Sequence, residues 1–173
     1  MLFRSFRCLM KMNLNKVVSG DNDNTIKVFD IVNDKVVLSF NGHTDLVKCF
    51  IKISDNEIAS GSLDETIKLW DTSNGKCFKT LNGHDDWIMC LVRLNEKQIA
   101  SGSRDKTIKI WDIKDGSCLK SLLNNLKNLN LNEGKCLITF TGHDGPITCL
   151  IKLNEYQIVS GSYDLSINIW NLF

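Results

Sequence analysis

Short runs of β-branched and aromatic residues alternate with polar turn residues along most of the chain. In one stretch the runs are VKCFIKI (47–53), EIASG (57–61), TIKLW (66–70) and KCFKTL (76–81), separated by SDN, LDE and TSNG. This pattern predicts four short β-strands joined by tight turns. Gly, Asn and Asp must form most of the turns, because the chain contains 11 Gly and a single Pro. The expected fold class is all-β.

A set of polar residues recurs along the chain at fixed spacing. An SGSxD sequence occurs three times, and SGDND at residues 19–23 is a fourth version. An aromatic residue followed by Asp or Asn stands at a constant distance after each one. A Gly-His pair precedes three of them, with the His 17 residues before its Ser, and the first two complete copies are 41 residues apart. The complete sets are His43, Ser60, Asp64 and Trp70; His84, Ser101, Asp105 and Trp111; and His143, Ser160, Asp164 and Trp170.

This repeat predicts a β-propeller. The strands of one repeat form a small antiparallel sheet, which buries both faces only when neighbouring sheets stack against it. We expect a single domain over residues 1–173, built of four-stranded blades, with about four blades in an incomplete or unclosed ring. The repeat units are 1–30 (partial), 31–71, 72–112 and 113–173.

The residues of the repeat also carry a family resemblance. The Gly-His pair, the SGSxD turn and the Trp-Asp ending resemble the WD-repeat (Trp-Asp repeat) β-propeller family over nearly the whole chain. The resemblance implies a buried tetrad in each complete repeat, in which the Trp indole contacts Ser, Ser contacts His and His contacts Asp. The first unit has Phe29 in place of Trp and no Gly-His pair, and the last unit ends in Asn171. We expect both terminal blades to be the loosest.

Ser, His and Asp are also the residue types of a hydrolase triad. Such a triad is a single constellation beside a substrate cleft. Here the set recurs three times at the same spacing. A fold of equivalent blades requires such repetition, whereas an enzyme needs only one set. Because a buried polar group without a partner costs about 1–3 kcal/mol, we interpret the tetrads as stabilising elements and expect no catalytic residues. The sequence has no Gly-rich phosphate loop, and no cofactor is expected.

The interval between the last two complete sets is 18 residues longer than the first interval. GSCLK, from residue 116, and GKCLI, from residue 134, are offset by the same 18 residues. The outer-strand segment therefore looks duplicated, and only one copy can occupy the strand position. The insertion covers residues 117–134, and its Leu/Asn stretch (121–133) fits a loop outside the ring, which we favour, or a short helix.

The predicted blades do not close a ring, because outer strands follow only three of the four sets of inner strands. Open sheet edges and bare blade faces favour aggregation. Three explanations stay open, in this order of preference. The chain is a piece of a longer protein, or a homo-oligomer such as a homodimer completes the ring, or the four blades close a small ring.

Composition argues against several classes of function. The chain has 21 Lys and Arg against 20 Asp and Glu, so a net charge of +1 gives no electrostatic basis for nucleic-acid binding. No apolar run is long enough to cross a membrane. The seven cysteines recur once per repeat in two registers and form no CxxC pair, so no metal site is expected. Half-buried thiols fit an intracellular, reducing compartment, cytoplasmic or nuclear.

The resemblance implies that other proteins or peptides dock where the Gly-His loops meet the SGSxD turns. The variable positions there precede the turn Asp or follow the His by three and five residues. They are Asn22, Leu63, Arg104 and Tyr163; Leu46, Trp87 and Pro146; and Lys48, Met89 and Thr148, with Arg7 equivalent to Lys48 in the first unit. Exposed Trp, Tyr and Arg contribute strongly to binding, so we expect a mixed apolar and basic platform for an extended peptide with an acidic or aromatic anchor. The alternative is that Trp87 packs under its own loop.

The sequence thus predicts a non-catalytic protein-protein interaction scaffold or adaptor. One alternative is a substrate-recognition fragment of a ubiquitin ligase receptor. Some family members reach a ligase adaptor through a WDxR box, but this chain has Lys114 where Arg is expected, and the two side chains bind differently. The other alternative is a non-functional fragment of a longer WD-repeat protein.

Overall fold

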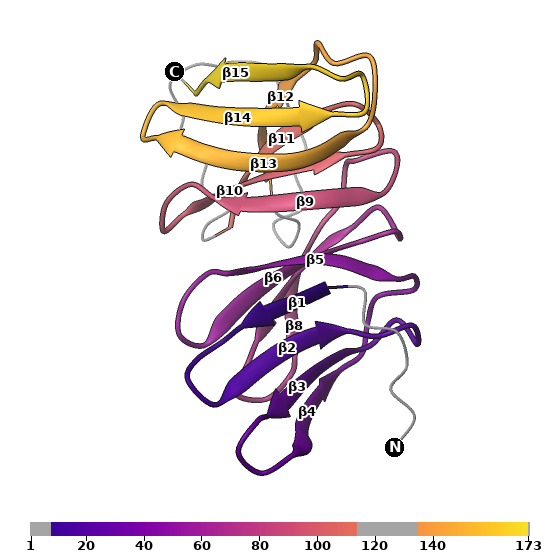
Figure 1. The fold of residues 1–173 in the computed structure, drawn as a ribbon, viewed down its shortest axis with the longest axis vertical. Helices are drawn as coiled ribbons and strands as arrows, with labels where there is room; N and C mark the ends of the chain where they lie inside the picture. Colours follow the sequence, from indigo (N-terminus) through magenta and orange to yellow (C-terminus); the bar gives the residue numbers. More distant parts are fainter. Residues whose placement is uncertain (1–7, 114–134, 173) are drawn as a thin grey trace.

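The computed structural model of the chain describes residues 8–113 and 135–172. These residues form fifteen β-strands in four antiparallel sheets, the last of which has three strands. The sheets follow one another in sequence order along the long axis of the molecule, with β1–β4 at one end and β13–β15 at the other (Figure 1). The described residues thus form an unclosed, all-β stack of blades, which confirms the fold class predicted from the repeat.

The strands of each sheet lie side by side in chain order. The first sheet comprises β1 (Cys8–Lys11), β2 (Lys16–Gly20), β3 (Ile26–Asp30) and β4 (Lys35–Phe40). The second comprises β5 (Val47–Lys52), β6 (Glu57–Ser62), β7 (Ile67–Asp71) and β8 (Cys77–Leu81). The third comprises β9 (Ile88–Arg93), β10 (Gln98–Ser103), β11 (Ile108–Asp112) and β12 (Lys135–Phe140). The fourth comprises β13 (Ile147–Asn154), β14 (Gln157–Ser162) and β15 (Ile167–Asn171).

The outer strand of the third sheet comes from the second copy of the duplicated segment. Strand β12 begins at Lys135 and pairs with β11 in the register Ile108 to Phe140 and Ile110 to Ile138. The insertion at 117–134, including its Leu/Asn stretch, lies outside the described residues. Each Gly-His loop follows an outer strand and leads into the inner strand of the next sheet, so it connects two blades.

The hydrophobic core consists of three layers, one between each pair of neighbouring sheets. Between the first and second sheets, Ile26 and Val28 of β3 pack with Ile58 of β6 and Trp70 of β7. The other two layers repeat this arrangement. They are formed by Ile67, Leu69, Ile99 and Trp111, and by Ile108, Ile110, Ile158 and Trp170. Alternation along each strand sends one set of side chains to the preceding sheet and the other set to the following sheet.

The glycine of the SGS sequence permits this close stacking. A Cβ atom added at Gly61 would overlap Ile88 of the third sheet, and one added at Gly102 would lie 2.5 Å from Ile147 of the fourth. A β-branched side chain from the next sheet therefore rests directly on the backbone at both positions. The glycine thus has a packing role in addition to its place next to the turn.

The turn after each SGSxD sequence includes a residue with left-handed backbone geometry. The φ angles are 65° at Asn24, 68° at Glu65, 69° at Lys106 and 67° at Leu165. Asn tolerates this geometry better than Leu does, because its short amide bonds locally to the backbone. Leu165 is also 97% exposed, so its side chain contributes little packing in the described structure.

We predict that Leu165→Asn stabilises the protein by about 0.5–1 kcal/mol, or about 1–4 °C in melting temperature, because it relieves backbone strain. The measurement is thermal unfolding followed by circular dichroism. Leu14→Asn is the matched control, since Leu14 is exposed and has no positive φ. Equal melting temperatures for Leu165→Asn and the parent would show that this turn carries no strain.

Candidate functional site

The structure brings together the four members of each predicted tetrad. In the second sheet the Trp70 indole N–H donates to Ser60 Oγ at 2.7 Å, and Ser60 Oγ lies 2.7 Å from His43 Nε2. His43 Nδ1 lies 2.7 Å from Asp64 Oδ2. The third and fourth sheets repeat all three contacts at 2.6–2.7 Å. Since a carboxylate only accepts, Nδ1 carries the imidazole proton, and Nε2 accepts from the Ser hydroxyl.

The tetrad hydroxyls differ from that of a hydrolase nucleophile in their surroundings. Ser60, Ser101 and Ser160 are fully buried, and each accepts a Trp indole N–H. Ser hydroxyls in this environment have no open path to a substrate. Within residues 8–113 and 135–172, every buried side-chain nitrogen and oxygen has a hydrogen-bond partner. The arrangement therefore fits a buried polar network whose members satisfy one another.

The carboxylates at the ends of the tetrads are held in the ionised form. Burial would raise the pKa of Asp64, but hydrogen bonds from the His43 imidazole and the Thr66 hydroxyl hold it well below its usual range. The pKa of Asp105 is lowered against burial in the same way, by His84 and Thr107. At Asp164 a hydrogen bond from the Ser166 hydroxyl is the largest cause of the lowered pKa.

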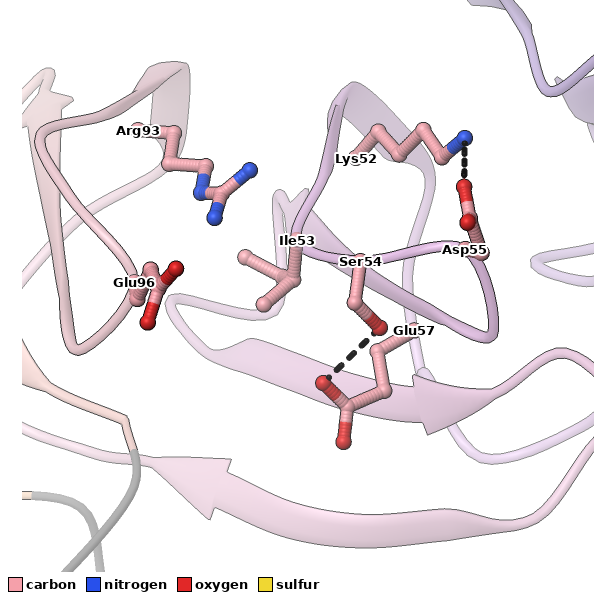
Figure 2. A pocket seen from close by; sticks show the side chains of 7 residues that line it. All are labelled: Lys52, Ile53, Ser54, Asp55, Glu57, Arg93 and Glu96. Atoms are coloured by element: carbon pink, nitrogen blue, oxygen red, sulfur yellow. Dashed lines mark hydrogen bonds and ion pairs between the residues drawn. The ribbon is translucent and has the colours of Figure 1, made fainter.

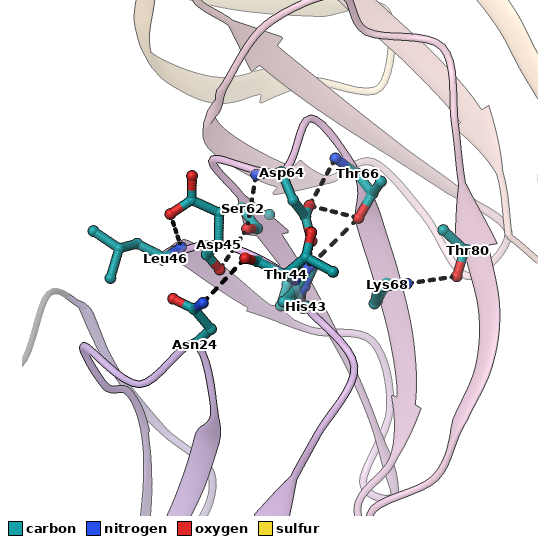
Figure 3. A network of polar contacts seen from close by, with 12 residues as sticks. Asn24, His43, Thr44, Asp45, Leu46, Ser62, Asp64, Thr66, Lys68 and Thr80 are labelled. Carbon is teal, nitrogen blue, oxygen red and sulfur yellow. Dashed lines mark hydrogen bonds and ion pairs between the residues drawn. The ribbon is translucent and has the colours of Figure 1, made fainter.

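The same carboxylates fasten the Gly-His loops to the SGSxD turns. Asp64 Oδ2 accepts the backbone N–H of Thr44 at 3.0 Å, and the Ser62 hydroxyl donates to the Asp45 carbonyl at 2.9 Å. Figure 3 shows these contacts gathered between the loop and the turn, with Leu46 projecting beside them. The backbone N–H of Leu63 then donates to the Leu46 carbonyl at 2.9 Å.

This fastening is repeated in the next two sheets. The Arg104 N–H donates to the Trp87 carbonyl at 2.9 Å, and the Tyr163 N–H donates to the Pro146 carbonyl at 3.0 Å. In these three sheets the variable position before the turn Asp is therefore joined to the variable position three residues after the His. The tetrads set the spacing of the side chains that the sequence singled out for binding.

A groove brings most of these side chains together across the second, third and fourth sheets. Eight of the eleven predicted positions line it: Leu46, Lys48, Leu63, Trp87, Met89, Arg104, Pro146 and Tyr163. Val47 lines it as well and was missed by the sequence reasoning, which considered only alternate positions after the His. Val47 could have been included from the sequence, because it lies between two predicted positions, Leu46 and Lys48.

Two residues of the groove lining form a stacked pair. The Arg104 guanidinium carbon lies 4.4 Å from the centre of a Trp87 ring, and Arg104 Nε lies 3.7 Å from Asp86 Oδ2. Trp87 is 38% exposed, so its indole lies partly against Arg104 and partly at the surface. A guanidinium on an indole gains a cation–π interaction and presents a flat cationic surface.

Two further predicted positions, Thr148 and Asn22, lie apart from the groove lining. The Thr148 hydroxyl donates to the Gly161 carbonyl at 3.1 Å. Asn22 is exposed in the turn of the first sheet, where its backbone N–H donates to Asp21 Oδ1. Arg7 lies outside the described residues.

The first sheet has an ion pair in place of a tetrad. Lys27 Nζ lies 2.6 Å from Asp21 Oδ2 and 2.9 Å from Asp23 Oδ2. Burial opposes the shift, but hydrogen bonds from Thr25 and Lys27 lower the pKa of Asp23 to about 2. The Ser19 hydroxyl, equivalent to the tetrad Ser, donates to the Lys27 carbonyl at 3.5 Å.

A second groove lies at the opposite ends of β6 and β10 and is lined by charged residues (Figure 2). Lys52 Nζ pairs with Asp55 at 2.8 Å, and the Ser54 hydroxyl donates to Glu57 at 3.1 Å. None of the predicted site residues lines it. Over the described ranges no cluster of His, Cys, Asp or Glu is arranged to hold a metal ion, and no helix there is long and apolar enough to span a membrane.

Comparison with protein families identifies the repeat. The family described as WD domain, G-beta repeat, matches residues 34–71, 75–112 and 134–171. No curated protein sequence matches the chain.

Solved structures similar to the chain include two computationally designed proteins and one WD40 domain. The computationally designed Ika4 protein superposes with a TM-score of 0.77 at 29% identity, over 98% of this chain and 92% of that one. The designed Ika8 protein gives 0.76 at 29%, over 97% and 46%. The WD40 β-propeller domain of Doa1 gives 0.80 at 26%, over 98% and 51%. The chain therefore spans about half the length of the last two.

We predict that His84→Ala destabilises the protein by about 2–4 kcal/mol, because Ser101 and Asp105 lose their partner inside the fold. The measurement is the free energy of unfolding from urea titration. Asp85→Ala is the control, since the Asp85 side chain is exposed and only its backbone N–H reaches Asp105. Unchanged stability of His84→Ala would contradict the stabilising role of the tetrads.

The lowered carboxylate pKa values predict a pH dependence of stability. An unfolded Asp has a pKa of about 3.9, so the contribution of Asp105 is complete above that pH and is lost as the pH falls toward the lower folded value. Asp105→Asn should therefore be less stable than the parent at neutral pH, and the difference should shrink between about pH 5 and pH 3. Urea titrations across this range measure it. A deficit that is constant with pH would mean that Asp105 is not held ionised.

Proposed function

Because the chain belongs to the WD40 repeat family, we propose that it is a non-catalytic interaction module that binds another polypeptide in the groove across its second, third and fourth sheets. The observation that carries this proposal is that one groove is lined by eight of the positions that the family resemblance implied. They come from three repeats, six of them from the Gly-His loops and the SGSxD turns and two from the starts of β5 and β9. A rigid platform assembled from several blades suits a binding surface better than a reaction centre.

The chemistry of the groove indicates what it recognises. Lys48 and Arg104 supply positive charge, and Leu46, Met89 and Tyr163 supply apolar contact area. We propose an extended peptide with an acidic side chain for Arg104 and an aromatic or aliphatic anchor beside Trp87. Arg and aromatic residues at the centre of a concave surface contribute most of the binding energy at protein interfaces.

A catalytic role has less support than a binding role. The three Ser-His-Asp sets lie inside the fold with their hydroxyls bonded to Trp, and they form a repeated network. The groove itself has Lys48 and Arg104 as its ionisable side chains, besides Tyr163. These groups bind anions, but they supply no nucleophile with a neighbouring base.

The cysteines support a proposed location in a reducing compartment, cytoplasmic or nuclear. All six in the described residues are free, and Cys77 and Cys149 are exposed. Burial raises the pKa of Cys8 to about 11 and that of Cys90 to about 12, which keeps these thiols protonated and unreactive.

We predict that peptides selected on the protein from a displayed random library are enriched in acidic and aromatic residues. Trp87→Ala and Arg104→Ala should each weaken their binding by about tenfold or more, measured by isothermal titration. Phe78→Ala, on the outer strand β8, is the control for loss of an exposed aromatic residue. Selected peptides that bind all three variants with the parent affinity would place the binding site elsewhere.

A further inference from the structure

The last sheet has a bare apolar face that is covered in every other sheet. Ile67 and Ile108 are fully buried under the following sheet, whereas Ile167, at the equivalent position of β15, is 75% exposed. Leu69 and Ile110 are buried in the same way, but Ile169 is 62% exposed. Ile151 of β13, which shares this face, is exposed as well. Such a continuous apolar face marks an interaction site.

The repeat identifies the kind of surface that covers this face. In the described stack, the following sheet covers the face that bears Ile26, Ile67 or Ile108, and three of the covering side chains stand at the same positions of each repeat. These are Phe50, Ile58 and Trp70 between the first two sheets, and Leu91, Ile99 and Trp111 between the second and third. A complementary partner for β13–β15 therefore presents an aromatic residue and two aliphatic or aromatic residues at this spacing.

The first sheet of the same chain carries that set on its own uncovered face. Leu9, Val17 and Phe29 occupy the positions equivalent to Phe50, Ile58 and Trp70. Leu9 is 65% exposed, and Val17 and Phe29 are only partly buried. The two ends of the stack therefore present the two halves of one interface.

A polar contact between sheets recurs at two of the three junctions of the stack, whereas Arg93, at the equivalent position of the third sheet, donates from Nε to the Asn95 carbonyl of its own sheet. Lys152 Nζ donates to the Leu94 carbonyl of the preceding sheet at 2.6 Å, and Lys52 Nζ donates to the Met12 carbonyl at 3.4 Å. Lys11 stands at the equivalent position of the first sheet and is exposed. Leu153, at the end of the stack opposite to Lys11, stands at the repeat position of Leu94, so its carbonyl is the equivalent acceptor for Lys11.

We propose that the occupant of the bare face is a second copy of this chain, docked head to tail, with the first sheet of each copy on the fourth sheet of the other. Two such contacts, related by a twofold axis, leave neither face exposed, so the assembly closes as a dimer. One copy spans 92% of the designed Ika4 protein but 46% and 51% of the two longer relatives, so two copies correspond in length to about one of those longer chains. This inference goes beyond the proposed peptide binding, because the groove lies away from both bare faces.

The test is the mass of the purified chain in solution, measured by light scattering on a sizing column. We expect twice 19.6 kDa for the parent. Ile169→Asp on the fourth sheet and Leu9→Asp on the first should each give a single 19.6 kDa species. Both side chains are exposed in the isolated stack, so unchanged circular dichroism is expected. Phe78→Asp, at an exposed position on neither face, is the matched control and should remain a dimer.

Several results would overturn the proposal. A monomeric parent would mean that the faces are covered by something other than a second copy. Dissociation by Ile169→Asp but not by Leu9→Asp would mean that two fourth sheets meet face to face. A species larger than the dimer would mean that the contact does not close. Trp87→Ala should remain dimeric, so loss of peptide binding and loss of the dimer are separate outcomes.

Discussion

The hydrogen-bonded chain from Trp through Ser and His to Asp is the interaction on which the interior and the surface both depend. At its buried end, the indole of Trp70 lies in the layer between two sheets and is anchored to β6 by Ser60. At its outer end, Asp64 holds the backbone of the Gly-His loop through Thr44. One polar network therefore couples the packing of neighbouring sheets to the position of the loops. That coupling explains why the same four residue types recur in each repeat that both packs on a neighbouring sheet and positions a Gly-His loop.

The first sheet shows what happens where this network is missing. In place of the buried chain, Lys27 forms ion pairs with the buried Asp21 and the partly exposed Asp23. Ion pairs with partly exposed members contribute less to stability than satisfied buried networks and weaken with salt. This sheet still packs on the second through Ile26 and Val28. Apolar contacts therefore contribute most of the stability at this end of the stack.

Much of the fold follows from the sequence because the signal is repeated, whereas the groove positions follow from the family resemblance that the repeat carries. A single Ser, His and Asp would have been ambiguous, but three sets in one register predict stacked sheets, and the alternating strands predict which side chains face inward. The Lys27 ion pair was not predictable, because it depends on how side chains orient in a unit that departs from the repeat. The choice between the duplicated segments was also open in the sequence, since both GSCLK and GKCLI match a strand, and register with β11 decides it. The stacking of Arg104 on Trp87 could not be predicted either, because it depends on the geometry of the turn that brings the two residues together.

The groove draws its lining from three successive sheets, and this has a thermodynamic consequence. A peptide that contacts Leu46, Arg104 and Tyr163 together touches the second, third and fourth sheets at once. Such a ligand binds only when the three sheets keep their native spacing, so it favours the assembled stack over any state in which one sheet has separated. At a free concentration 100 times its dissociation constant, this linkage amounts to about 2.7 kcal/mol. Ligand affinity and the free energy of separating one sheet from the stack are then thermodynamically linked.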